Sequence, residues 1–98
     1  MIQVVICDEH GKWLSDFIDV PHSILSRVHE HPLSCLSYVD PYGDTMFNHL
    51  QLPSMRGDLQ LLQAVVTDRG DIEFVRRLQL LVEECTKEPH RYLKFVGD

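Results

Sequence analysis

The sequence has few cysteines and no long apolar run, and both shortages exclude whole classes of protein. The longest apolar run near the start, residues 4–7, has no basic residue before it, and it is too short for a signal peptide or a membrane span. The three widely spaced cysteines, Cys7, Cys35 and Cys85, form no disulfide framework and no C-x-x-C motif. Each lies in an apolar stretch, where a free thiol packs as a small hydrophobe. We therefore expect a cytoplasmic protein that does not act at a membrane.

Positive charge and enzyme motifs are also scarce. Nine Lys and Arg face fifteen Asp and Glu, giving a formal charge of −6, which opposes binding to nucleic acid. There is no G-x-G-x-x-G, no phosphate loop and no G-x-S-x-G nucleophile elbow. A nucleophilic role for Cys35 would need a histidine beside it. The sequence therefore names no reaction and no cofactor.

What the chain does contain is the composition of one globular domain, residues 1–98. Of its 98 residues, 44% are apolar and 24% are charged. A domain of this size buries roughly 65% of its extended-chain surface. That is enough for one core, with little room for a large active-site cavity.

The first half of the chain predicts four strands and a short helix. Residues 2–7 and 13–18 predict a hairpin whose turn needs a positive φ at Gly11. Residues 21–31 predict about two turns of helix between two prolines. Residues 33–40 and 45–50 predict two further strands, joined by a type I turn over residues 40–44 with Gly43 left-handed.

The second half predicts a helical hairpin and a last strand. Apolar residues repeat with a period of 3.6 over residues 53–66 and again over residues 71–87, and residues 92–96 alternate as a strand. Leu62, Leu78 and Leu81 are predicted core residues. The fold class is α+β: a mainly antiparallel sheet of order ββαββααβ along the chain, with the helical hairpin packed on one face.

The predicted path gathers acidic residues at one end of the domain. A helix of about eight residues rises only about 12 Å, whereas a strand of six is roughly 20 Å long, so we expect antiparallel returns throughout the first half. The last strand should then run parallel to the first and third. This path gives an acidic pole, the predicted partner-binding site, which consists of Asp8, Glu9, Asp40, Asp44, Asp68, Asp71 and Asp98 with Lys12 and Arg69, a net charge of −5. Turn and cap chemistry explains each Asp taken singly.

Histidines offer a weaker cluster. His22, His29 and His31 surround the short helix, with His49 at the end of the fourth predicted strand. The His29-x-His31 spacing turns the two rings about 200° apart on a helix, and no H-x-x-x-H motif occurs. Histidine near a helix C-terminus also suits the helix dipole. We predict no metal site here.

Two segments resemble parts of small uncharacterised bacterial proteins. They are residues 40–48, a DPYGDT-x-FN turn, and residues 88–98, an EPH-x-YLKFVGD ending, together about a fifth of the chain. The resemblance implies a bacterial cytosolic origin and no catalytic activity. The size, acidity and α+β layout are also similar to those of immunity proteins that block toxins.

Together these observations favour a non-enzymatic, immunity-like binding module whose acidic pole meets a basic protein surface. The alternative is a divalent-metal protein or small enzyme that uses the acidic pole or the group of His22, His29 and His31. We also expect a homodimer through a sheet edge or through the face with Trp13 and Phe17, since two large aromatics on a hairpin need a cover.

Overall fold

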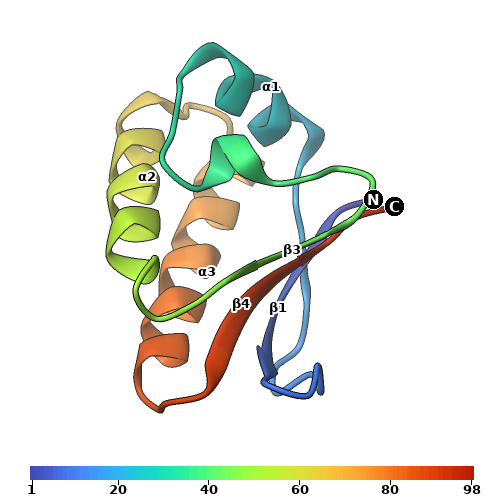
Figure 1. The fold of residues 1–98 in the computed structure, drawn as a ribbon. Coiled ribbons are helices and arrows are strands. Elements are labelled where there is room, and N and C mark those ends of the chain that lie inside the picture. The colour runs from blue at the N-terminus through green and yellow to red at the C-terminus, as the bar shows by residue number, and fades with distance from the viewer.

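The computed structural model describes all residues, Met1–Asp98, and shows an α+β fold (Figure 1). The fold contains four strands, three α-helices and one short 3-10 helix. In chain order they are β1 (Gln3–Asp8), β2 (Ile18–Asp19), α1 (His22–Glu30), η1 (Leu36–Tyr38), β3 (Asp44–Phe47), α2 (Leu52–Val65), α3 (Arg69–Thr86) and β4 (Arg91–Val96). None of the helices is both long and apolar enough to cross a membrane.

The four strands form one antiparallel sheet in the order β2-β1-β4-β3. The central pair, β1 and β4, is in register from Gln3 opposite Val96 to Asp8 opposite Arg91. Helices α2 and α3 pack together as a hairpin against one face of this sheet, and α1 lies across one end (Figure 1). The predicted fold class and the helical hairpin are therefore confirmed.

Alternation along the strands explains where the core lies. Val4 and Ile6 of β1 and Leu93 and Phe95 of β4 point to the same face and are almost completely buried. The helices meet them with stripes at helical spacing, formed by Met55, Leu59, Leu62, Phe74, Val75, Leu78, Val82 and Cys85. Leu62 and Leu78 belong to the core as predicted, and Leu81 packs against it partly buried.

Residues 33–40 do not form the predicted strand. They form a loop that contains η1, because side chains rather than a neighbouring strand satisfy its backbone amides. The Asp58 carboxylate accepts hydrogen bonds from the amides of Ser34, Cys35 and Leu36, and the Ser37 hydroxyl accepts one from Leu33. The sheet therefore has four strands instead of five.

The loss of that strand reverses the path of the rest of the chain. The last strand, β4, runs antiparallel to β1, so the predicted parallel direction was wrong. It is antiparallel to β3, the fourth predicted strand, as the predicted path required. The predicted strand over residues 13–18 also shrinks, because only Ile18 and Asp19 pair with β1 beyond a single bridge between Trp13 and Cys7. The turn before it is as predicted, with Gly11 at φ 84°.

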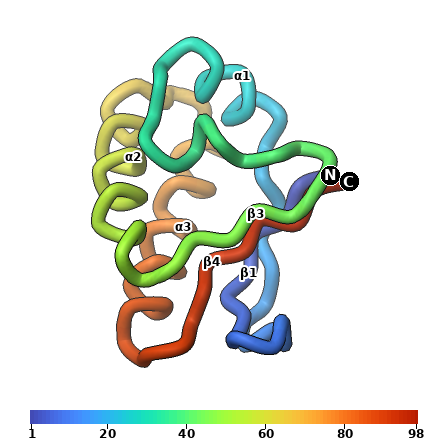
Figure 2. Tube along the Cα trace, in the orientation of Figure 1, coloured from blue at the N-terminus to red at the C-terminus, as the bar shows by residue number.

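The two ends of the chain meet beside the turn that precedes β3 (Figure 2). The Gly97 amide donates to the Gly43 carbonyl at 2.9 Å, and the Asp98 amide donates to Pro41. Gly43 does not have the predicted left-handed conformation, since Gly11 is the only glycine with a positive φ. Glycine at position 97 instead allows a close approach, because a Cβ there would lie 2.3 Å from the Gly43 oxygen.

Candidate functional site

The seven acids of the predicted pole do not converge. Asp8 lies opposite Arg91 at one end of the β1–β4 pair, with Glu9 following it, whereas Asp98 lies beside Met1 at the other end. Six residues of strand separate these ends by roughly 20 Å, well beyond a Debye length of about 8 Å. Asp40 and Asp44 lie on the Asp98 side. The acidic pole was wrong as a single surface, because β4 runs in the opposite direction to the one expected.

Asp68 and Asp71 form a third group, at the start of α3. Asp68 caps this helix by accepting hydrogen bonds from the amides of Gly70 and Asp71, as the Ncap position prefers. Asp71 is 1% exposed, and its carboxylate accepts a hydrogen bond from the Ser23 hydroxyl of α1. Its side chain therefore joins two helices and is closed to a partner.

The remaining acids are also engaged locally. Asp8 accepts hydrogen bonds from the amides of His10 and Lys12, and that of Lys12 is the main cause that lowers the pKa of the Asp8 carboxyl. Asp44 pairs with Lys94 at 3.4 Å, and Asp98 pairs with the Met1 amine. Asp40 accepts from the Tyr42 amide. Turn, cap and ion-pair chemistry thus accounts for the acids one by one.

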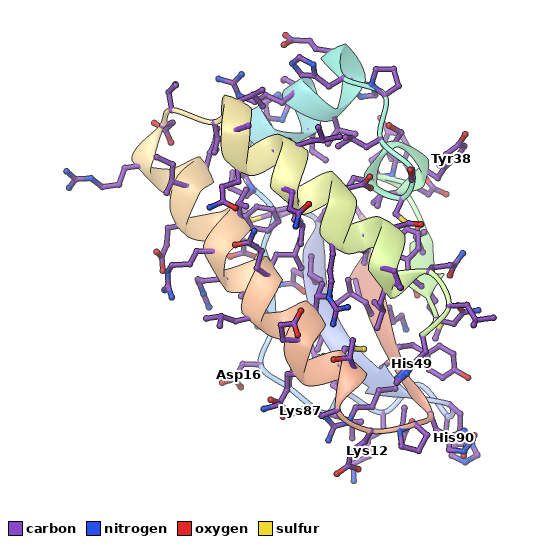
Figure 3. The ribbon with its side chains drawn as sticks, turned by 90° about the vertical axis from the view of Figure 1, so that its left-hand side faces the viewer. Lys12, Asp16, Tyr38, His49, Lys87 and His90 are labelled. Atoms are coloured by element: carbon purple, nitrogen blue, oxygen red, sulfur yellow. The ribbon has the colours of Figure 1, made fainter.

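The histidines make no metal centre. His22, His29 and His31 are all exposed around α1, and no three His, Cys, Asp or Glu side chains anywhere in the chain come together to hold an ion. His49 lies instead near His90, toward the opposite end of the molecule from α1 (Figure 3). The metal alternative therefore lacks a ligand set in either of its two predicted places.

The cysteines are packed as small hydrophobes. All three are buried, and burial raises the pKa of each thiol, to about 11 for Cys85. The Cys35 thiol donates to the Gln51 carbonyl at 3.7 Å. A raised pKa reduces the thiolate fraction near neutral pH, so none of these groups is activated as a nucleophile.

The sheet face opposite the helices has no helix over it (Figure 1). Val5 and Cys7 of β1 point to this face, away from the main core that includes their neighbours Val4 and Ile6, and both are nevertheless completely buried. The register places on the same face the side chains opposite them on β4 and β3. We call this surface the open face, and its sheet residues are Gln3, Val5, Cys7, Asp19, Asp44, Met46, Tyr92, Lys94 and Val96.

Two aromatic side chains lie at the β1 side of the open face. Trp13 bridges to Cys7, and its ring packs edge to face with Phe17 at a centroid distance of 6.2 Å. The segment between β1 and β2 holds them in place, because the Ser15 hydroxyl accepts a hydrogen bond from the Ile6 amide and the Leu14 amide donates to the Ile6 carbonyl. Trp13 is 43% exposed and Phe17 44% exposed.

Charges surround this aromatic pair unevenly. Asp16 and Asp19 are exposed and make no ion pair, and Lys12 is the unpaired cation of the same segment. On the far side of the face, Lys94 extends over the sheet toward Asp44, so its charge is neutralised within the chain. Across the β4–β3 pair, Met46 is 44% exposed. The exposed apolar side chains of the open face are thus Trp13, Phe17 and Met46, and free carboxylates lie along one rim.

Sequence patterns identified the aromatic pair but left open which face the helices would cover. The stripes on α2 and α3 show that a face is covered, without showing which one. Comparison with known proteins adds no relative: no family model, no curated protein and no solved structure matches this chain.

Proposed function

We propose that this chain is a non-enzymatic protein-binding module and that the open face of its sheet is the binding surface. The observation that carries the proposal is the Trp13–Phe17 pair, nearly half exposed on a face without a helix over it. Trp and Tyr are enriched among residues that dominate binding energy. Aromatic rings also supply a large contact area at a small cost in side-chain entropy.

The rim charges favour a basic partner with an apolar centre. Asp16 and Asp19 stand free beside the aromatic pair, and the chain carries a net charge of −6. Lysine or arginine side chains around the partner's contact surface would meet these carboxylates. Such complementary rim charges mainly speed association and select partners. Blocking a basic toxin, as immunity proteins do, is one role that this surface would serve.

The dimensions of the sheet indicate why the rim must take part. A six-residue strand is roughly 20 Å long and four strands span roughly 14 Å, so the flat sheet face measures roughly 300 Å² in projection. A stable interface covers about 800 Å² on each partner. A partner must therefore extend past the strands onto the segment between β1 and β2, which holds Asp16 and the two aromatic rings.

The test compares how well the parent chain and two variants capture partner proteins. Each variant loses two exposed apolar side chains, on different faces of the molecule. The purified chain, Trp13→Ala/Phe17→Ala and Leu61→Ala/Leu80→Ala are immobilised, and proteins retained from a cell lysate are identified and then purified for direct binding. Leu61 and Leu80 are good controls because each is 59% exposed on the helices of the covered side. Circular dichroism first verifies that all three proteins are folded.

Support requires a basic protein that binds the parent and the Leu control, binds at least tenfold more weakly to the aromatic variant, and associates more slowly with Asp16→Lys/Asp19→Lys. Equal binding by all variants would refute the open face as the surface. Sedimentation of the parent over a wide concentration range tests another occupant. A dimer that the aromatic substitutions dissociate would assign the face to a second copy of the chain and overturn the basic partner.

A further inference from the structure

A cavity separate from the main core lies where the chain leaves β3 and where it enters β4. It is broadly open to solvent, and its volume is about 320 Å³, at the lower limit of small-molecule sites. Antiparallel pairing of β3 with β4 brings together two connections that are some forty residues apart in the sequence. The polar residues that line it are Asn48, His49, His90, Arg91 and Tyr92.

The chemistry of this lining differs from that of the rest of the chain. Each of the five polar side chains can donate a hydrogen bond, and none is a carboxylate, although the sequence has fifteen of them. The remaining lining residues, Leu50 and Pro89, are apolar. A cavity lined by hydrogen-bond donors is suited to an acceptor group such as a carboxylate or phosphate, held by hydrogen bonds rather than by net charge.

Neighbouring contacts hold two of the donors in position. Arg91 is only 21% exposed at its side chain, and its Nη1 donates to the Glu84 carbonyl at the end of α3 at 2.8 Å. The Arg91 guanidinium also lies 3.6 Å from the Glu84 carboxylate and 3.9 Å from that of Glu88. Because a guanidinium has five N–H donors, these contacts orient Arg91 and still leave donors for a ligand.

His90 has a fixed backbone conformation, and its side chain lies beside a carboxylate. It is the only non-glycine residue with a positive φ, 61°, an uncommon conformation that marks sites where the surroundings fix the backbone. Its Nδ1 lies 3.3 Å from a Glu9 carboxylate oxygen. The glutamates therefore support His90 and Arg91 from outside, without lining the cavity.

A third lining residue, His49, has a ring nitrogen without a hydrogen-bond partner. Its Nε2 is buried and has no hydrogen-bond partner, the only side-chain nitrogen or oxygen in the chain in that state. A buried polar atom without a partner costs about 1 to 3 kcal/mol. Because this atom has almost no accessible surface, a ligand in the cavity would contact it only after the imidazole rotates.

We propose that this cavity binds a small ligand through a carboxylate or phosphate group, with His49, His90 and Arg91 as its principal donors. The site is distinct from the open face, and the proposal does not depend on that surface binding a protein. Tyr92 borders both, since it lies opposite Cys7 on the open face and also lines the cavity.

The experiment titrates the full chain with inorganic phosphate and, separately, with succinate, each against sodium chloride at equal ionic strength. Amide shifts in ¹H–¹⁵N spectra report the site. The expected result is saturable shifts confined to residues 48–50 and 89–92 with at least one of the two anions. The tighter of the two identifies the group that is recognised. Shifts that do not saturate, or that match those in chloride, would overturn the proposal.

Variants then test the named donors. His90→Asn tolerates the positive φ but is too short to replace the imidazole, and His49→Gln retains a polar group of similar length. Each should weaken binding about tenfold, whereas His29→Gln, an exposed histidine on α1, should leave it unchanged. Equal weakening in the His29 variant, or none in the other two, contradicts the assignment. Because His90 is exposed, its variant remains informative even if His49→Gln fails to fold.

Discussion

Removing the carboxylate of Asp58 should destabilise the fold more than any other substitution of a charged residue. Asp58 is 2% exposed on α2 and accepts hydrogen bonds from the amides of Ser34, Cys35 and Leu36 at 2.9, 2.8 and 3.0 Å. A hydrogen bond to a charged group contributes about 1.5 to 3 kcal/mol. The Ser34 amide is only partly buried and can bond to water in the variant. We therefore expect Asp58→Ala to cost about 3 to 6 kcal/mol, a large share of the roughly 5 to 15 kcal/mol of a typical domain.

Urea denaturation followed by far-ultraviolet circular dichroism measures this cost, with Gln60→Ala as the control because Gln60 is exposed on the same helix. Hydrogen exchange locates it: the amides of residues 34–36 should lose protection before those of β1 and β4. Asp58→Asn should fall between the parent and Asp58→Ala, since it keeps one acceptor oxygen. A loss below about 0.5 kcal/mol for Asp58→Ala, within the range of ordinary surface substitutions, would refute this account of the loop.

Three further predictions concern packing and pH. Gly97→Ala should destabilise the protein by more than about 2 kcal/mol, because its new Cβ would lie 2.3 Å from the Gly43 oxygen; thermal melts check this. Leu62→Ala and Leu78→Ala should each cost about 2 to 5 kcal/mol in urea melts, and changes within error for both would contradict the helical-hairpin core. Burial raises the pKa of Cys85 to about 11 from 9.0, so the folded state keeps the neutral thiol. The resulting stability is complete below pH 9 and is lost as pH rises toward 11, by about 3 kcal/mol at most. Cys85→Ala should show a smaller decrease over that interval, and an equal decrease would exclude Cys85 as its source.

Local sequence signals were sufficient for the helices. The apolar period predicted the two long helices, because a stripe depends on residues within a few positions of each other, although α3 begins at Arg69, two residues before the predicted start. The segment over residues 33–40 was different. Its apolar alternation suited a strand, but an acid on α2, more than twenty residues away, satisfies its amides. No pattern within the segment could predict that contact.

The same contact between Asp58 and residues 34–36 explains why the predicted acidic pole does not form. With a loop in place of that strand, β3 and β4 take the opposite directions from those expected, and Asp8 and Asp98 separate to opposite ends. The preference of Asp for turns was correctly identified at Asp8 and Asp40. The position of each acid in space depended on the topology. The pairing of His49 with His90 around one cavity was likewise visible only once β3 and β4 were neighbours.

The position of β4 has a consequence for how the chain reaches its native state. This strand is the last to be synthesised among the elements described here, and it pairs with β1 on one side and β3 on the other. Until β4 has been synthesised, β1 and β3 have no strand between them. Each then has an unpaired edge, and the apolar side chains that β4 contributes to the core are missing. Contacts between segments far apart in sequence form slowly, and unpaired edges invite association with other chains. A nascent chain that pauses before residue 91 would therefore hold a formed helical hairpin over an unfinished sheet, the state in which a chaperone would be needed most.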